Sequence, residues 1–152
     1  MQIIKRLTNG EVENFEDWEL TKNRPVPLHL IENILPTILF VQNIRTVIGV
    51  AIGVGSGYRD YLANLEAGGD EDSLHLEFNG LDFTPKGYSA ADLQQLCARI
   101  ENGEFNITVM WKRKLVTITP ELLGLGLNKA KGFIHIDTRG LLGRKAPSRW
   151  GY

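Results

Sequence analysis

Apolar and polar positions along the chain alternate between helical and strand-like spacing. Apolar residues at helical spacing between residues 31 and 41 predict a helix that is kinked, or restarts, at Pro36. The β-branched run at residues 46–54 is typical of a buried strand. Residues 58–66 predict a short helix that stops before Gly68 and Gly69.

The second half of the chain has the pattern of strands around one amphipathic helix. Ser89, followed three residues later by an acid, predicts the start of a helix that runs to about residue 101. Three further segments have strand-like composition, at residues 75–83, 105–119 and 131–138. The first contains an irregularity at Asn79 and Gly80, and the second is a hairpin around a basic turn. Helices and strands in this mixture predict one α+β domain.

Length and composition support a single domain and exclude several classes of function. The chain has 152 residues, room for one domain, which we divide into an irregular N-terminal arm (residues 1–24) and a body (residues 25–152). We expect the arm to contain a short turn of helix that packs Phe15 and Trp18 on the body. The 17 Lys+Arg nearly balance the 18 Asp+Glu, so no overall basic field attracts nucleic acid. We find no signal peptide and no apolar run typical of a membrane-spanning helix, and we expect a soluble, cytoplasmic product as synthesised.

Cysteine and histidine are scarce, which restricts the possible metal chemistry. The single cysteine, Cys97, excludes an internal disulfide and a thiolate zinc site, and its helical position predicts a core residue. The three histidines are His29, His75 and His135, of which we expect His29 to lie on the surface.

The other two histidines lie near acids in predicted strands. His75, Asp82 and His135 form a His₂Asp set, which suits a hydrolytic zinc site with an open coordination position. Seven residues separate the first two, so a regular strand would place them on opposite faces. They share a metal only if the chain bends, and Asn79 with Gly80 is where it could. Taken singly, each histidine is more often structural, and a structural His/Asp set would bind no zinc.

A longer pattern contains this set. Its pieces are, in order, Ser56-Gly57-Tyr58-Arg59, Asn64, Gly68-Gly69, Ser73, His75, Asp82-Phe83 and His135-Ile136-Asp137. In this order and spacing they closely resemble the M15 metallopeptidases, which are zinc D-Ala-D-Ala carboxypeptidases and related phage endolysin peptidases. An N-terminal Phe/Trp-Glu segment and a C-terminal Arg-Trp extend the likeness over most of the chain.

The resemblance implies roles for individual residues. It implies Zn²⁺ ligands at His75, Asp82 and His135. It implies that Arg59 binds a substrate carboxylate or carbonyl, for which a guanidinium is suited because it donates two parallel hydrogen bonds. Ser73 lies two residues before His75 and would share its face in an extended chain, so we expect its hydroxyl to bond either the substrate or a group behind the ligands. We expect Tyr58 to contact the substrate. The implied fold is a small, mainly antiparallel sheet with helices packed on one side, as in hedgehog-like and D-Ala-D-Ala peptidases.

Two departures from the family pattern affect the chemistry. Phe78 and Gly80 stand where the family usually has Gly and Ala. Many members have a Glu or Asp general base three residues before the last ligand, but here that residue is Gly132. Asp137 lies two residues after His135, on the same face of a strand, and is either the base or a residue that orients His135. Glu77 is the second candidate for the general base. For both Asp137 and Glu77, the alternative is a structural carboxylate in an outward salt bridge.

The resemblance implies a hydrolase that cuts an amide bond in peptidoglycan stem peptides, as a carboxypeptidase or an endopeptidase, with a link to phage lysis. We expect a monomer that reaches the cell wall after release or export. The alternative is an inactive M15-like module that binds or organises the cell wall. The reason for this alternative is Gly132, which stands where many members have the general base.

Overall fold

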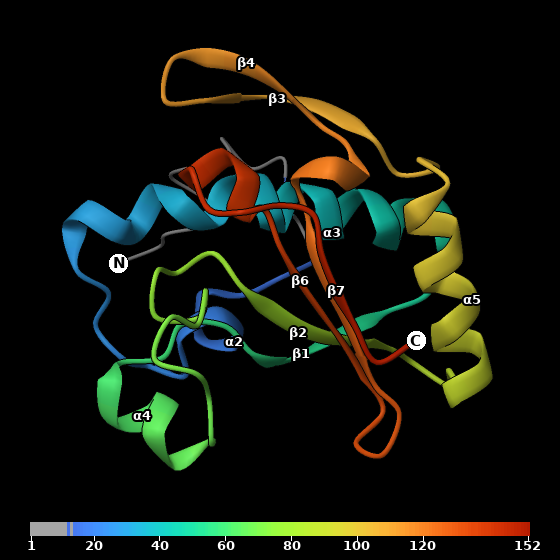
Figure 1. The fold of residues 1–152 in the computed structure, drawn as a ribbon, viewed down its shortest axis with the longest axis horizontal. Helices are drawn as coiled ribbons and strands as arrows, with labels where there is room; N and C mark the ends of the chain where they lie inside the picture. Colours follow the sequence, from blue (N-terminus) through green and yellow to red (C-terminus); the bar gives the residue numbers. More distant parts are fainter. Residues whose placement is uncertain (1–11, 13) are drawn as a thin grey trace.

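A five-stranded mixed sheet is the centre of the computed structural model, which describes residue 12 and residues 14–152 (Figure 1). Its strands are β1 (Ile52–Ser56), β2 (Leu81–Pro85), β5 (Gly124–Asn128), β6 (Phe133–Asp137) and β7 (Ser148–Trp150). They lie in the order β1-β2-β6-β5-β7, antiparallel except for the parallel pair β5–β7. A separate hairpin is formed by β3 (Ile107–Trp111) and β4 (Lys114–Ile118).

Helices surround this sheet. The α-helices are α2 (Asp17–Thr21), α3 (Leu35–Ile48), α4 (Tyr61–Glu66) and α5 (Ala90–Glu101), and the 3₁₀ helices are η1 (Leu28–Ile34), η2 (Pro120–Leu122) and η3 (Arg139–Leu142). Figure 1 shows α3 running behind the sheet, with the hairpin on the far side of α3 and α5 at one end of the sheet. The architecture is therefore α+β, as expected.

The core lies between α3, α5 and one face of the sheet. Phe83 on β2, and Ile134 and Ile136 on β6, are fully buried in the same cluster as Phe40 of α3 and Leu96 of α5. Because side chains alternate along a strand, the intervening residues of β2 and β6 face the other way. The core thereby fixes which residues of these two strands can form a site.

Several local predictions are confirmed. The 3₁₀ helix η1 gives way to α3 next to Pro36, so the helix restarts there. Ser89 and Asp92 form a reciprocal capping box at the start of α5. The hairpin is present, and β6 falls within the strand expected at residues 131–138.

Two strand predictions were wrong in part. Residues 46–48 belong to α3, which ends where Gly49 adopts a left-handed conformation (φ 68°), and β1 begins only at Ile52. These residues are β-branched but exposed or half-buried on the last turn of α3, with Val47 50% exposed, so composition did not separate a helix from a strand here. His75 lies in a turn at residues 74–78 rather than in a strand, and β2 begins at Leu81.

The expected N-terminal arm is described only from residue 14 onward and at Val12; the rest of it lies outside the described residues. It contains the short helix α2, and Phe15 packs in the core as predicted. Trp18, which we expected to pack on the body, is 56% exposed with Lys22 against its ring. In the described part of the chain, no helix is long and apolar enough to cross a membrane.

Candidate metal centre

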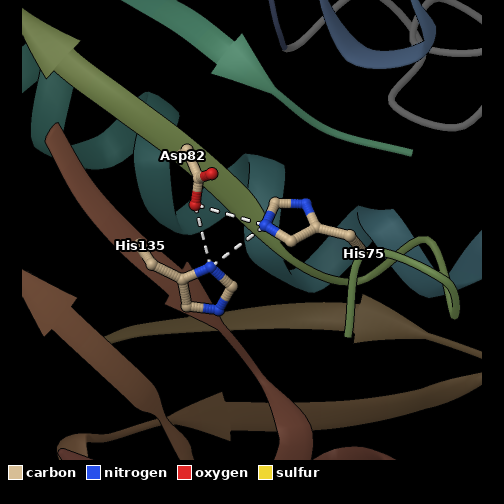
Figure 2. Close-up of side chains that lie close together, drawn as sticks. All are labelled: His75, Asp82 and His135. Atoms are coloured by element: carbon tan, nitrogen blue, oxygen red, sulfur yellow. Dashed lines mark hydrogen bonds and ion pairs between the residues drawn. The ribbon is translucent and has the colours of Figure 1, made fainter. Parts of the chain in front are cut away.

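Three side chains distant in sequence converge on one point. His135 Nδ1 lies 3.2 Å from His75 Nε2 and 2.9 Å from Asp82 Oδ1, and His75 Nε2 lies 3.2 Å from the same oxygen (Figure 2). Among the described residues, this is the group of His, Cys, Asp and Glu whose ligand atoms lie close enough to hold one ion.

Strand register brings two of the three together. Asp82 on β2 and His135 on β6 are directly opposite partners in the antiparallel ladder. Directly opposite residues in such a ladder point to the same face with their Cβ atoms about 5 Å apart. The face is the one turned away from Phe83 and Ile134, which are in the core. The sheet therefore presents a carboxylate beside an imidazole on its open face.

The turn before β2 delivers the third side chain. The backbone N–H groups of Asn79 and Gly80 both donate to the carbonyl of Leu74, at 3.0 and 3.1 Å, which folds the chain back on itself. Phe78 closes this turn with φ 51°, a conformation that favours glycine, and glycine is the residue the M15 pattern usually has there. A Cβ on Gly80 would lie 2.9 Å from the His135 ring. This turn resolves the seven-residue offset between His75 and Asp82.

The outer nitrogens of both imidazoles are held by hydrogen bonds. His75 Nδ1 donates to the carbonyl oxygen of Gly57 at 2.6 Å, and a carbonyl can only accept, so this nitrogen carries the proton. His135 Nε2 faces Asp137 Oδ2 at 2.7 Å. Hydrogen bonds on Asp137 hold its pKa far below the usual range, against the effect of burial, so Asp137 is ionised and accepts from His135. When the imidazoles are neutral, the nitrogens that face Asp82, which are His75 Nε2 and His135 Nδ1, therefore carry no proton and present lone pairs.

Two imidazole lone pairs and a carboxylate oxygen directed at one point repel one another unless a positive charge lies between them. Burial alone would raise the pKa of Asp82, but the adjacent His135 and His75 side chains outweigh it and lower that pKa. Burial alone would lower the pKa of His135, but Asp137 and Asp82 outweigh it and raise that pKa. The cluster thus stabilises cationic charge, and two nitrogens with one oxygen fit the three protein ligands of a hydrolytic Zn²⁺ site.

Asp137 is fully buried behind His135. Its Oδ1 accepts from the backbone N–H groups of Gly124 and Arg139, both at 3.1 Å. The Arg139 guanidinium donates to both carboxylate oxygens at 2.9 Å. Because Asp137 contacts the outer nitrogen of His135 and does not line the cleft, a role as general base does not fit its position. The other expected possibility, orientation of His135, does.

The remaining candidates differ in their placement. Arg59 Nη2 lies 3.3 Å from Asp82 Oδ2, and its Nε donates to Ser56 Oγ at 3.0 Å. Ser73 Oγ accepts from the backbone N–H of His75 at 3.2 Å. Both residues line the cleft beside the cluster of His75, Asp82 and His135. Tyr58 does not, because it is 6% exposed and its ring packs edge-on against Phe78. This position favours a core role for Tyr58, and its contact with substrate stays a prediction.

The cluster lies at the side of an open cleft of about 840 Å³. The residues that line it include residues 67–70 next to α4, residues 72–75, and Asn128, Lys131, Phe133 and Trp150. Glu77, the second candidate for the base, does not line the cleft and pairs with Arg144 at 3.9 Å. Gly132 lies in the turn before β6 with φ 73°, where it supplies no acid–base group.

A buried polar network ties the His75 turn to the end of β6. Asn79 Nδ2 donates to Thr138 Oγ1 and to the Asn33 carbonyl, both at 2.8 Å, and Asn79 Oδ1 accepts from the Thr138 N–H at 2.9 Å. Thr37 of α3 completes the network with a 3.0 Å bond to Thr138 Oγ1. These side chains are almost completely buried, so the network holds the turn, β6 and η1–α3 in a fixed arrangement.

Two residues near the cluster were not assigned a role from the sequence. Arg139, paired with Asp137, is two residues further along the chain, and this spacing was the available signal. The Trp150 ring lies 5.1 Å from the His135 ring and occupies the space over Gly126, where a Cβ would clash with the indole. Trp150 arrives from β7 by a parallel pairing that no sequence pattern indicates.

Comparison with protein families agrees with this geometry. The model of a family described as Peptidase M15 matches residues 13–118, well over half of the chain. The match includes His75 and Asp82, while His135 lies beyond it and joins them only through the fold. Among curated proteins, none matches the chain. A family match of this extent, together with a cleft that holds a His₂Asp cluster, shows that the chain belongs to the Peptidase M15 family.

Proposed function

We propose that the protein is a zinc peptidase that hydrolyses an amide bond in peptidoglycan stem peptides, with His75, Asp82 and His135 as the zinc ligands. The observation that carries the proposal is the convergence of two tautomer-fixed imidazole nitrogens and a carboxylate oxygen beside an open cleft. When bound, zinc supplies a Lewis acid that polarises a peptide carbonyl and activates water for attack.

Arg59 is the residue we assign to substrate orientation. Its guanidinium is part-buried at the cleft and is fixed by Ser56 and by the outer oxygen of Asp82. Oriented in this way, it can donate to a substrate carboxylate or carbonyl close to the ligands, which reduces the entropy cost of reaching the reactive geometry. Ser73, which also lines the cleft, offers a hydroxyl hydrogen for a second contact because its oxygen already accepts from His75 N–H.

Asp137 is assigned to orientation of His135 rather than to proton transfer. Its carboxylate holds the His135 Nε2 proton and is itself fixed by Arg139. Carboxylate–histidine pairs of this kind set the tautomer of a metal ligand and raise its basicity. Of the acids that line the cleft, Asp70 and Asp72 are outside the ligand set, and they are the carboxylates available for proton transfer.

The experiment is metal analysis of the purified chain followed by release of peptide fragments from purified peptidoglycan. We expect one zinc per chain, release that stops with a chelator and returns with added zinc, and loss of zinc in His135→Ala. His29→Ala, which changes a histidine outside the cluster, is the matched control and should retain both zinc and release. A chain that binds no zinc would refute the site, and unchanged release in His135→Ala would refute its role.

One observation favours a second function, an M15-like module that binds cell-wall peptide without cutting it. The position where many members carry a base is Gly132, and neither Asp137 nor Glu77 lines the cleft to replace it. Such a module would bind zinc and peptidoglycan and release nothing from walls of several chemical types. Zinc content and peptide release, measured on one preparation, separate the two functions.

A further inference from the structure

The β3–β4 hairpin lies apart from the cleft and presents an unusual surface. Residues 107–118 contain three cations and no acid, although the whole chain has a net charge of −1. Lys112, Arg113 and Lys114 are all exposed. Beside them, Met110 is 56% and Leu115 is 72% exposed. Basic and apolar groups are therefore concentrated at one end of this hairpin.

The register shows how these groups are arranged. Met110 and Leu115 are directly opposite partners, so their side chains share the outward face nearest the turn. Further from the turn, that face carries Thr108 and Thr117, joined by a 2.9 Å hydrogen bond. The outward face thus changes from polar at its base to apolar near the turn. Lys112 and Arg113 form the turn itself, and Lys114 follows it as the partner of Trp111.

Two of the three cations have backbone conformations that are unfavourable for residues other than glycine. Lys112 and Arg113 have φ values of 48° and 65°, the pair of left-handed conformations that a two-residue hairpin turn normally fills with Asn-Gly. Glycine adopts this conformation without the steric cost that a side chain incurs. A hydrogen bond of 2.8 Å from Trp111 Nε1 to the Glu32 carbonyl ties the hairpin to η1, and Lys112 Nζ lies 4.6 Å from the Trp111 ring.

We propose that this hairpin tip docks the protein on the surface of an anionic lipid bilayer. Lys112, Arg113 and Lys114 contact the phosphate-bearing headgroups, and Met110 and Leu115 enter the interface between headgroups and acyl chains. The apolar pair is the reason to choose a bilayer over a hydrated anionic polymer, because a polymer of that kind offers no medium that would bury Met110 and Leu115. None of the residues that line the cleft belongs to the hairpin, so docking leaves the cleft accessible.

The test uses the full chain and sedimentation with vesicles of phosphatidylcholine alone or mixed with phosphatidylglycerol. We expect binding to the mixed vesicles that weakens with salt, and little binding to phosphatidylcholine alone. Each cation near an anionic surface contributes about fivefold to affinity, so Lys112→Gln/Arg113→Gln/Lys114→Gln should bind about 100-fold more weakly. The matched control Lys86→Gln/Lys129→Gln/Lys145→Gln removes the same charge at other exposed positions and should lose much less.

A second variant separates a bilayer from a polyanion. Met110→Ser/Leu115→Ser should weaken binding to the mixed vesicles several-fold and leave any binding to soluble polyphosphate unchanged. No binding of the unmodified chain to the mixed vesicles would overturn the proposal. Equal losses in the two triple variants, or no loss in the Met110→Ser/Leu115→Ser variant, would overturn it too. All these positions are exposed, and thermal melting of each variant verifies that it is folded. The experiment needs no zinc or peptidase activity, so its outcome is independent of the proposed function.

Discussion

Replacing Asp137 by Asn tests the assignment of the buried carboxylate most directly, because the side chain keeps its shape and loses its charge. In the native site, Oδ1 accepts from Gly124 N–H, Arg139 N–H and Arg139 Nε, and Oδ2 accepts from Arg139 Nη2 and His135 Nε2. All five partners are donors. If the Asn amide keeps its oxygen at the Oδ1 position, its NH₂ group faces the donors of Arg139 and His135. In the opposite orientation, the NH₂ group faces the three donors that contact Oδ1 in the native site. Either orientation therefore brings donors against donors.

His135 can relieve this conflict in one way. If it gives up the Nε2 proton and accepts from the amide, its proton moves to Nδ1, the atom that faces Asp82 and His75. A protonated Nδ1 has no lone pair for a metal, so zinc binding must reverse the change and restore the donor–donor contact. Loss of such an outer hydrogen bond typically lowers metal affinity about 10- to 100-fold, which corresponds to about 1.4 to 2.7 kcal/mol.

The assay is competition for zinc against a chelator of known affinity, at a temperature where both proteins are folded. We expect Asp137→Asn to bind zinc about 10- to 100-fold more weakly. Glu71→Gln, which removes an exposed carboxylate outside the cleft, should bind as the unmodified protein does. A folded Asp137→Asn protein with unchanged zinc affinity would refute the tautomer argument.

Three further predictions concern stability and reactivity. Asn79→Ala removes three buried hydrogen bonds and leaves the Thr138 N–H without its acceptor, so we expect a loss of about 3 kcal/mol in denaturant unfolding; a loss under 1 kcal/mol would contradict the described network. Because the folded-state pKa of His135 is raised, its stabilisation of the metal-free protein is complete below the unfolded pKa of about 6.5 and is lost as pH rises through the folded value. The melting temperature of the metal-free protein should therefore fall as the pH rises above about 6.5, and a rise would refute the assignment. Burial raises the pKa of Cys97 to about 12, so a thiol reagent at pH 8 should label it only after unfolding, and rapid labelling of the native protein would show that the residue is not buried.

Local patterns in the sequence predicted much of the fold. The capping residues of α5, the alternation in the hairpin and the apolar spacing of α3 each depend on residues within a few positions of one another. The error at residues 46–48 arose because α3 continues through exposed or half-buried β-branched residues, whose composition alone favours a strand. The strands β5 and β7 were not predicted, because β5 is rich in glycine and β7 has three residues.

The same division applies to the site. By itself, the sequence determined the candidate ligands, because one cysteine and three histidines leave few possible sets, and the M15-like pattern selects His75, Asp82 and His135. Tertiary structure decided the rest: the turn at residues 74–78 that brings His75 to Asp82, the burial of Tyr58, and the position of Asp137 behind His135. The physical reason is that periodicity and spacing report on neighbours along the chain, whereas strand register and burial depend on segments that meet only when the core forms.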